Sequence, residues 1–362
     1  MSTVVIGEGL ASSVTRREPA RWIESARFDL LFFILSPLLV LPAVVGVMFQ
    51  VPHVLAIGSL LAFPHYFSSA TFYFWDERRE YHRTRWIAFY LGPVIIGAAF
   101  LLLIYYRIPL IVQFILFFWN TFHVARQSCG ILSIYRHRAG ISDRLQRDAA
   151  NLAILSVSTW LALWNISTHQ QVLPLLLNVH PKFPQFVWAV SGAIAIFALG
   201  RLAYAIWKRY TAGQRFGFPE GAFLVTSLLL FYPYLIISDS AMATFSMLLP
   251  HYVQYLGIVW MVHRRKFRES AGSPGQQALA FLSSNLKVLI PVLVSIGMLF
   301  VVAGSLYRRY GYFSQFETVY LFIAFEHFYL DGIFWAFKRR EIRDSLVPYL
   351  MRGPAPAEKV AA

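Results

Sequence analysis

Four histidines lie deep inside apolar stretches long enough to cross a lipid bilayer, and they are the residues in this sequence best suited to chemistry. They are His65, His123, His251 and His327. Counted back from the ends of their stretches, each lies about 10 to 12 residues deep, or ~15–18 Å along a helix, near the middle of a ~30 Å hydrocarbon core. Neutral imidazole is the commonest metal ligand and suits iron, copper and zinc. The four side chains therefore predict a metal centre, with a proton or ion pathway and structural hydrogen bonding as alternatives.

The residues next to two of these histidines repeat. His65 lies in FPHYFSS and His251 lies in LPHYVQY, so each follows a proline and precedes a tyrosine. Proline removes a backbone hydrogen bond and bends a helix locally, which can aim the next side chain away from the regular spiral. The next residues, Tyr66 and Tyr252, are candidates to donate hydrogen bonds to an oxygen molecule bound at the predicted metal. Simple packing and anchoring at the membrane interface are the alternatives for both.

The other two histidines are each followed, four residues later, by a polar side chain. His123 lies in FWNTFHVARQ, which places Gln127 at this spacing, and His327 lies in FIAFEHFYLDG, which places Asp331 there. Residues four apart share one face of a helix. Asp331 is expected to be a metal ligand, an acceptor that orients a histidine, or the ion-pair partner of Arg126. Gln127 and Gln254 are expected to lie beside the ligands or to face the substrate.

Aromatic residues crowd two of the stretches that carry these histidines, between Phe114 and Phe122 and between Phe316 and Phe337. Core packing and lipid contact explain many of them. The functional interpretation is a wide apolar pocket for a rigid hydrophobic substrate such as a polyene, a quinone or a sterol.

The elements that position these residues follow from composition. Of the 362 residues, 57% are hydrophobic and 14% are charged, which is too little charge to cover a water-soluble surface. The single cysteine, Cys129, excludes an intramolecular disulfide. The sequence also lacks a Walker loop and a nucleophile elbow. About ten stretches approach the ~20 apolar residues that a membrane-spanning helix needs, and we place them at 28–49, 54–75, 86–106, 109–135, 149–168, 185–207, 219–237, 241–263, 286–306 and 315–337.

The predicted fold is an all-α, polytopic bundle of about ten transmembrane helices over 28–337, with a polar N-terminal segment at 1–27 and a basic tail at 338–362. Most of the 32 lysines and arginines fall in these two segments and in alternate loops, whereas the opposite loops hold only Arg107, Lys182, Arg308 and Arg309. This bias predicts an integral membrane protein, of the inner membrane in a bacterium, with both termini in the cytoplasm. It also accounts for the net charge of +14 through anionic membrane lipids, so no nucleic-acid partner is expected. The repeated motifs suggest a parallel 4+2+4 internal repeat.

The four histidines on separate apolar stretches give the chain a resemblance to the Brp/Blh family of membrane-bound carotene dioxygenases, an architectural likeness over most of the chain rather than a motif match. The resemblance implies a polytopic protein in which dispersed intramembrane histidines hold one iron ion. The leading interpretation is a membrane metalloenzyme, a non-haem Fe(II) oxygenase acting on a lipid-soluble isoprenoid, carotenoid or other lipid substrate. A haem or quinone electron carrier and a transporter with a His/Arg/Asp proton relay are the alternatives, and zinc, copper and haem remain alternative cofactors.

Overall fold

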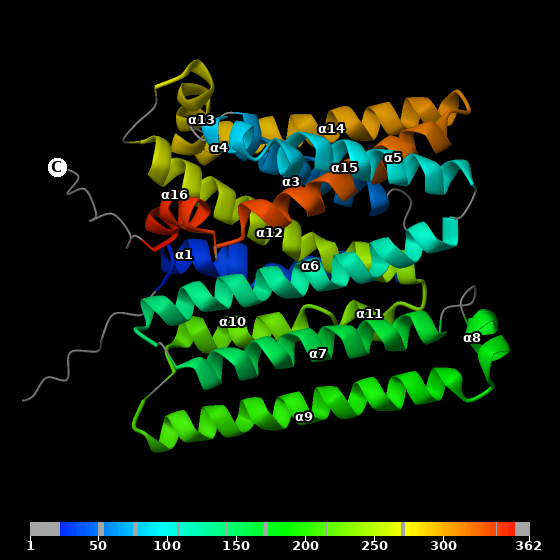
Figure 1. Cartoon of the computed structure of the whole chain (residues 1–362), viewed down its shortest axis with the longest axis vertical. Coiled ribbons are helices and arrows are strands. Elements are labelled where there is room, and N and C mark those ends of the chain that lie inside the picture. Colours follow the sequence, from blue (N-terminus) through cyan, green and yellow to red (C-terminus); the bar gives the residue numbers. More distant parts are fainter. Residues whose placement is uncertain are drawn as a thin grey trace, which may run out of the picture.

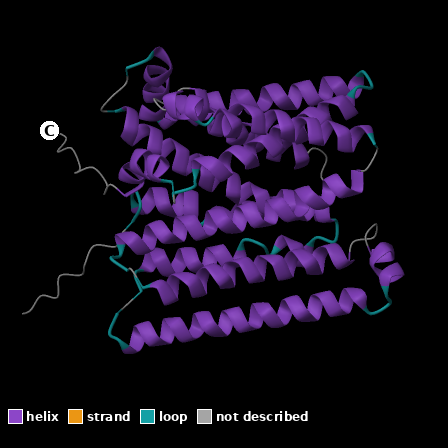
Figure 2. Ribbon diagram, viewed as in Figure 1, coloured by secondary structure: helices purple, strands orange, loops and turns teal. Residues whose placement is uncertain are grey.

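The computed structural model describes residues 22–49, 54–74, 79–106, 109–141, 143–168, 173–214, 216–268, 272–337 and 339–351. Within these ranges every regular element is a helix and no strand occurs (Figure 2). The prediction of an all-α chain is therefore confirmed.

Helices cover each of the ten apolar stretches. In chain order they are α1 (Ala26–Asp29), α2 (Val40–Met48), α3 (Val54–Phe74), α4 (Arg79–Thr84), α5 (Gly92–Tyr105), α6 (Pro109–Arg138), α7 (Arg144–Thr168), α8 (Leu173–Val179), α9 (Phe183–Thr211), α10 (Phe218–Leu229), α11 (Pro233–Ile236), α12 (Ser240–Phe267), α13 (Pro274–Ser284), α14 (Leu286–Arg309), α15 (Phe313–Phe334) and α16 (Arg340–Met351). Two π-helical turns, η1 (Leu30–Ile34) and η3 (Ile87–Leu91), and one 3₁₀ turn, η2 (Ser36–Leu39), adjoin α1, α2 and α5.

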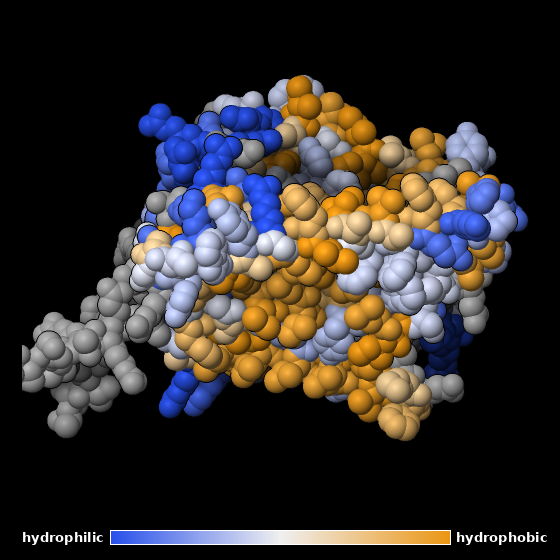
Figure 3. All heavy atoms as spheres, turned by 90° about the horizontal axis from the view of Figure 1, so that it is seen from below, coloured by the Kyte–Doolittle hydropathy of each residue, from blue (hydrophilic) through white to orange (hydrophobic). Residues whose placement is uncertain are grey.

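The long helices run side by side between two ends of a bundle. The short helices α1, α4, α13 and α16 gather at one end and α8 lies at the other, while α9 lies at the outer edge beside α7 (Figure 1). Hydrophobic side chains form a broad belt across the middle of one face, and hydrophilic side chains lie toward the ends (Figure 3). Such a belt is the surface that a hydrocarbon layer requires.

Fewer helices than predicted meet a length and hydropathy criterion for crossing a membrane. Five do so, α7, α9, α12, α14 and the pair α10–α11, and a sixth span results if the bent pair Ala26–Ile34 and Ser36–Gly46 is counted as one. Ten spans and the 4+2+4 repeat are not confirmed. Three of the helices below the criterion, α3, α6 and α15, carry His65, His123 and His327. Their polar residues lower the mean hydropathy of these helices, so the site itself weakens the membrane signal.

The first predicted span, 28–49, is not one straight helix. Its two halves meet at an angle of 47°, and Pro37 lies in the first turn of the second half. Proline has no backbone N–H and its ring crowds the preceding turn, so a break at this point has a local cause.

Small residues allow the helices of the bundle to approach one another closely. A side chain on Gly58 of α3 would collide with the Phe245 ring of α12, and a Cβ on Gly297 of α14 would lie 2.6 Å from the Leu60 backbone. Glycine at a helix contact lets two backbones come together without a side chain between them. The α3–α12 contact matters most, because these helices carry His65 and His251.

Candidate metal centre

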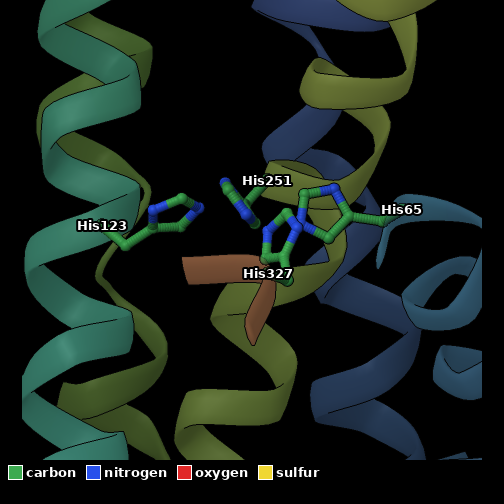
Figure 4. Close-up of side chains that lie close together, drawn as sticks. All are labelled: His65, His123, His251 and His327. Carbon is green, nitrogen blue, oxygen red and sulfur yellow. The ribbon is translucent and has the colours of Figure 1, made fainter. Parts of the chain in front are cut away.

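Four helices each supply one histidine to a common point. His65 comes from α3, His123 from α6, His251 from α12 and His327 from α15, and their rings point toward one another (Figure 4). One ring nitrogen from each histidine lies within 4.8 Å of the others. The ring centroids that lie closest are separated by 4.3 to 5.5 Å. The convergence predicted from depth alone is therefore confirmed.

The nitrogens of these rings are buried and mostly without hydrogen-bond partners. His65 and His251 are 0% exposed, and neither nitrogen of either ring has a partner. The Nε2 atoms of His123 and His327 are also buried and unpartnered. Because an unpaired buried polar atom costs stability, such atoms are rare in folded proteins and call for an explanation. A cation among the four rings would give each lone pair a partner.

A hydrogen-bond network supports His327 and Asp331. The Asp331 Oδ1 atom accepts from Tyr255 Oη at 2.7 Å and from Ser69 Oγ at 2.8 Å. Tyr255 in turn accepts from Trp335 Nε1 at 3.3 Å. Ser69 Oγ also lies 2.9 Å from His327 Nδ1.

The hydrogen bonds of Ser69 indicate the tautomer of His327. Ser69 has one hydroxyl proton; when it donates this proton to Asp331 Oδ1, its oxygen accepts from His327 Nδ1–H and contacts the Tyr255 hydroxyl at 2.7 Å. With the proton on Nδ1, Nε2 carries the lone pair and faces the other histidines. A metal-binding histidine is usually oriented by a hydrogen bond from the ring nitrogen that does not bind the metal.

One of the three interpretations of Asp331 is wrong. Arg126 is exposed, and within the described residues Asp331 forms no ion pair with it. The basic side chains near Asp331 Oδ2 are instead those of His327, at 3.6 Å from Nε2, and His123, at 3.7 Å from Nε2.

Gln127 and Gln254 contact the frame of the site rather than the histidine rings. Gln127 Nε2 donates to the backbone oxygen of His251 and to Gln254 Oε1, each at 3.3 Å. Gln254 Nε2 donates to Ser36 Oγ at 3.0 Å. The two glutamines therefore tie α6, α12 and the break in the first span together at the level of His251.

Tyr66 and Tyr252 contact the site with their rings while their hydroxyls meet each other. The Tyr252 ring lies 4.8 Å from the His65 ring, and the Tyr66 ring lies 5.1 Å from the His327 ring, between centroids. The Tyr66 hydroxyl lies 3.4 Å from that of Tyr252 and 3.3 Å from that of Tyr320. The phenol groups of these tyrosines therefore line one side of the cluster.

Sequence reasoning missed Ser69, Tyr255 and Trp335, although a signal for two of them was present. Ser69 lies four residues after His65 and Tyr255 lies four residues after His251, the same spacing that singled out Gln127 and Asp331. All four histidines are thus followed by a polar residue one turn later. Three of these residues meet in one network.

Of the remaining histidines, those that the structure describes do not join the cluster. His53 and His169 lie outside the described residues, and His137 and His180 are exposed. His82 and His263 are buried, and His263 Nε2 contacts Thr71 Oγ1 at 2.7 Å. Cys129 is buried and free, in keeping with a small packing residue.

No protein-family model, curated protein or solved structure matches the chain.

Proposed function

We propose that this protein is a membrane metalloenzyme, a non-haem iron oxygenase that acts on a lipid-soluble substrate within the bilayer. The observation that carries the proposal is the convergence of four buried imidazoles whose facing nitrogens lack partners. Nitrogen ligands of this kind suit iron, and a site with unfilled coordination positions is what oxygen-activating iron proteins use. The resemblance to the Brp/Blh family points to the same class of reaction.

The bound ion would supply redox chemistry and an attachment point for oxygen. His65, His123, His251 and His327 would hold it, and the Ser69 hydroxyl would keep the proton of His327 on Nδ1. The buried rings of Tyr66 and Tyr252 lie against His327 and His65 and exclude water from that part of the cluster. A dry, preformed set of ligands is the contribution that a protein makes to metal catalysis.

The substrate would approach from the α6 side. His123 is the least buried of the four histidines, with 13% of its side chain exposed. Trp119 and Phe122 beside it are 45% and 57% exposed, and Phe328 packs against the His123 ring at 5.1 Å between centroids. These apolar rings suit a hydrophobic substrate that reaches the centre from the surrounding lipid.

The proposal includes the finer topology predicted from sequence, with ten spans, a 4+2+4 repeat, both termini in the cytoplasm and membrane lipids as the surroundings. The coincidence of helices with all ten apolar stretches supports it. The helices α1 and α16, which lie nearest the two termini, share one end of the bundle, as an even number of spans requires (Figure 1).

The geometry favours this function over the alternatives. A haem with two axial histidines needs space for the macrocycle between the rings, whereas these four rings are only 4.3 to 5.5 Å apart where they are closest. A relay of His, Arg and Asp lacks its arginine, since Arg126 does not join the cluster.

Nitric oxide tests the proposal, because it replaces oxygen at open positions on ferrous iron. Detergent-purified protein loaded anaerobically with Fe(II) should bind nitric oxide and give the electron paramagnetic resonance signal of a non-haem ferrous nitrosyl complex. The same sample should show no Soret band. A Soret band would support haem instead, and loaded iron that gives no nitrosyl signal would remove the oxygenase interpretation.

A further inference from the structure

One carboxylate oxygen of Asp331 lies at the edge of the histidine cluster and has no hydrogen-bond partner. This atom, Oδ2, is buried. This oxygen lies 3.6 Å from His327 Nε2 and 3.7 Å from His123 Nε2, too far for hydrogen bonds to either ring. These two nitrogens are themselves unpartnered.

The other oxygen of the same carboxylate is fully engaged. Oδ1 accepts two hydrogen bonds, from Tyr255 and Ser69, which come from α12 and α3. Trp335, at the end of α15, donates a hydrogen bond to the Tyr255 hydroxyl. The network therefore fixes the plane of the carboxylate and leaves Oδ2 directed at the cluster, as for a carboxylate whose second oxygen binds a metal.

The distances from Asp331 Oδ2 to two of the four histidines fit a shared ion. Two ligand atoms that each lie about 2.0–2.2 Å from one metal are roughly 3–4 Å apart. The separations of Oδ2 from the two Nε2 atoms fall in this range. A carboxylate oxygen binds zinc and iron at much the same distance as an imidazole nitrogen does.

Charge provides an independent argument. Asp331 is buried at the depth of the histidines, and no lysine or arginine in the described part of the chain pairs with it. A carboxylate in such a place is costly unless a cation or hydrogen bonds compensate it. Four imidazoles supply no positive charge when neutral, whereas a divalent ion among them supplies it directly.

We infer that Asp331 is a fifth ligand, through Oδ2, of the metal ion that the four histidines hold; this inference rests on the proposed function. Five protein ligands leave one position of an octahedron open. The added oxygen ligand favours divalent ions such as Fe(II), Mn(II) and Co(II) over Cu(I), because carboxylates suit harder metals.

Cobalt tests the inference, since Co(II) bound in the site of the full, detergent-purified chain has a visible spectrum that depends on ligand number. Asp331→Asn keeps the shape of the side chain and removes its charge. We expect this variant to bind Co(II) more than about 100-fold more weakly than the wild type and to show a changed spectrum. Tyr255→Phe removes the hydrogen bonds of the Tyr255 hydroxyl to Asp331, Ser69 and Trp335 but no metal ligand. It should lose about 10–100-fold or less and keep the wild-type spectrum.

Cu(I) affinity serves as a check on folding. Asp331→Asn should retain nearly wild-type affinity for Cu(I), because its four histidines are intact and a carboxylate contributes little to that ion. Retention of Cu(I) together with loss of Co(II) would support the fifth ligand. Wild-type Co(II) affinity and spectrum in Asp331→Asn, with binding abolished in His327→Ala, would overturn the inference and leave the proposed function standing. A wild-type protein that binds no Co(II) would overturn both.

Discussion

Replacing His251 with alanine is expected to weaken metal binding by roughly 100- to 1,000-fold. Structural metal sites with four ligands contribute about 10–16 kcal/mol of binding free energy, or about 2.5–4 kcal/mol for each ligand, and each ~1.4 kcal/mol is tenfold in affinity. His251 is fully buried, and its ring lies between those of His65 and His123 at 4.7 and 4.9 Å. Water cannot easily replace the His251 ring at this buried position, so we expect a loss nearer 1,000-fold than 100-fold. Isothermal titration of the purified protein with Fe(II) or Co(II) measures the effect.

His180→Ala is the matched control, because His180 is exposed and lies far along the chain from every cluster residue. Its metal affinity should equal that of the wild type. Thermal unfolding in detergent separates loss of ligation from loss of folding. A bound metal stabilises the wild type by about 2.7 kcal/mol at a hundredfold excess over its dissociation constant. His251→Ala should unfold like the metal-free wild type and gain almost nothing from metal. Equal gains in both proteins would contradict the assignment of His251 as a ligand.

The largest effect on stability is expected at a buried ion cluster that joins α6, α9 and α10. Glu220 Oε1 lies 2.8 Å from Arg209 Nη1 and 3.2 Å from Arg136 Nε, and the side chains of all three residues are at most 5% exposed. Gln146 accepts from Arg136 through its backbone oxygen at 3.0 Å. Removing one partner from a buried ion pair typically costs about 3–5 kcal/mol, because the remaining charge stays desolvated. Glu220→Ala should therefore lower the free energy of unfolding by about that amount.

The chain offers a matched exposed control for this substitution. Asp148 also contacts two arginines, Arg144 and Arg147, each at 3.4 Å, but all three side chains are substantially exposed. Exposed pairs contribute little because water and salt screen them. Unfolding in mixed detergent micelles, followed by tryptophan fluorescence, should show a large loss for Glu220→Ala and almost none for Asp148→Ala. Similar losses in the two variants would mean that burial of the Glu220 cluster does not determine its contribution.

The four histidines could be predicted because a helix in a bilayer converts sequence position into depth. Counting residues from the ends of apolar stretches placed His65, His123, His251 and His327 at one level, and packing of the helices then brought the rings together. The same periodicity identified Asp331 one turn from His327. The same spacing, applied to every histidine, would also have identified Ser69 and Tyr255.

Other features depend on contacts between helices, which periodicity does not encode. Asp331 lies near His123 and His327 rather than in an ion pair with Arg126, and this depends on how the helices pack against one another. The Glu220 cluster joins residues from three helices with no shared spacing, so no pattern within one helix indicates it. A hydropathy criterion counts fewer spans than the ten apolar stretches. The polar residues that build the site lower the hydropathy of α3, α6 and α15.

X-ray absorption at the iron edge is the sharpest test of the four-histidine metal centre, because it reports the atoms bound to the metal. In detergent-purified protein loaded with one equivalent of iron, we expect a shell of nitrogen and oxygen atoms at about 2.0–2.2 Å. We also expect outer-shell scattering from about four imidazole rings, which should fall in His251→Ala. A shell of oxygen atoms with scattering from one imidazole or none would contradict the claim that these four histidines hold a single metal ion.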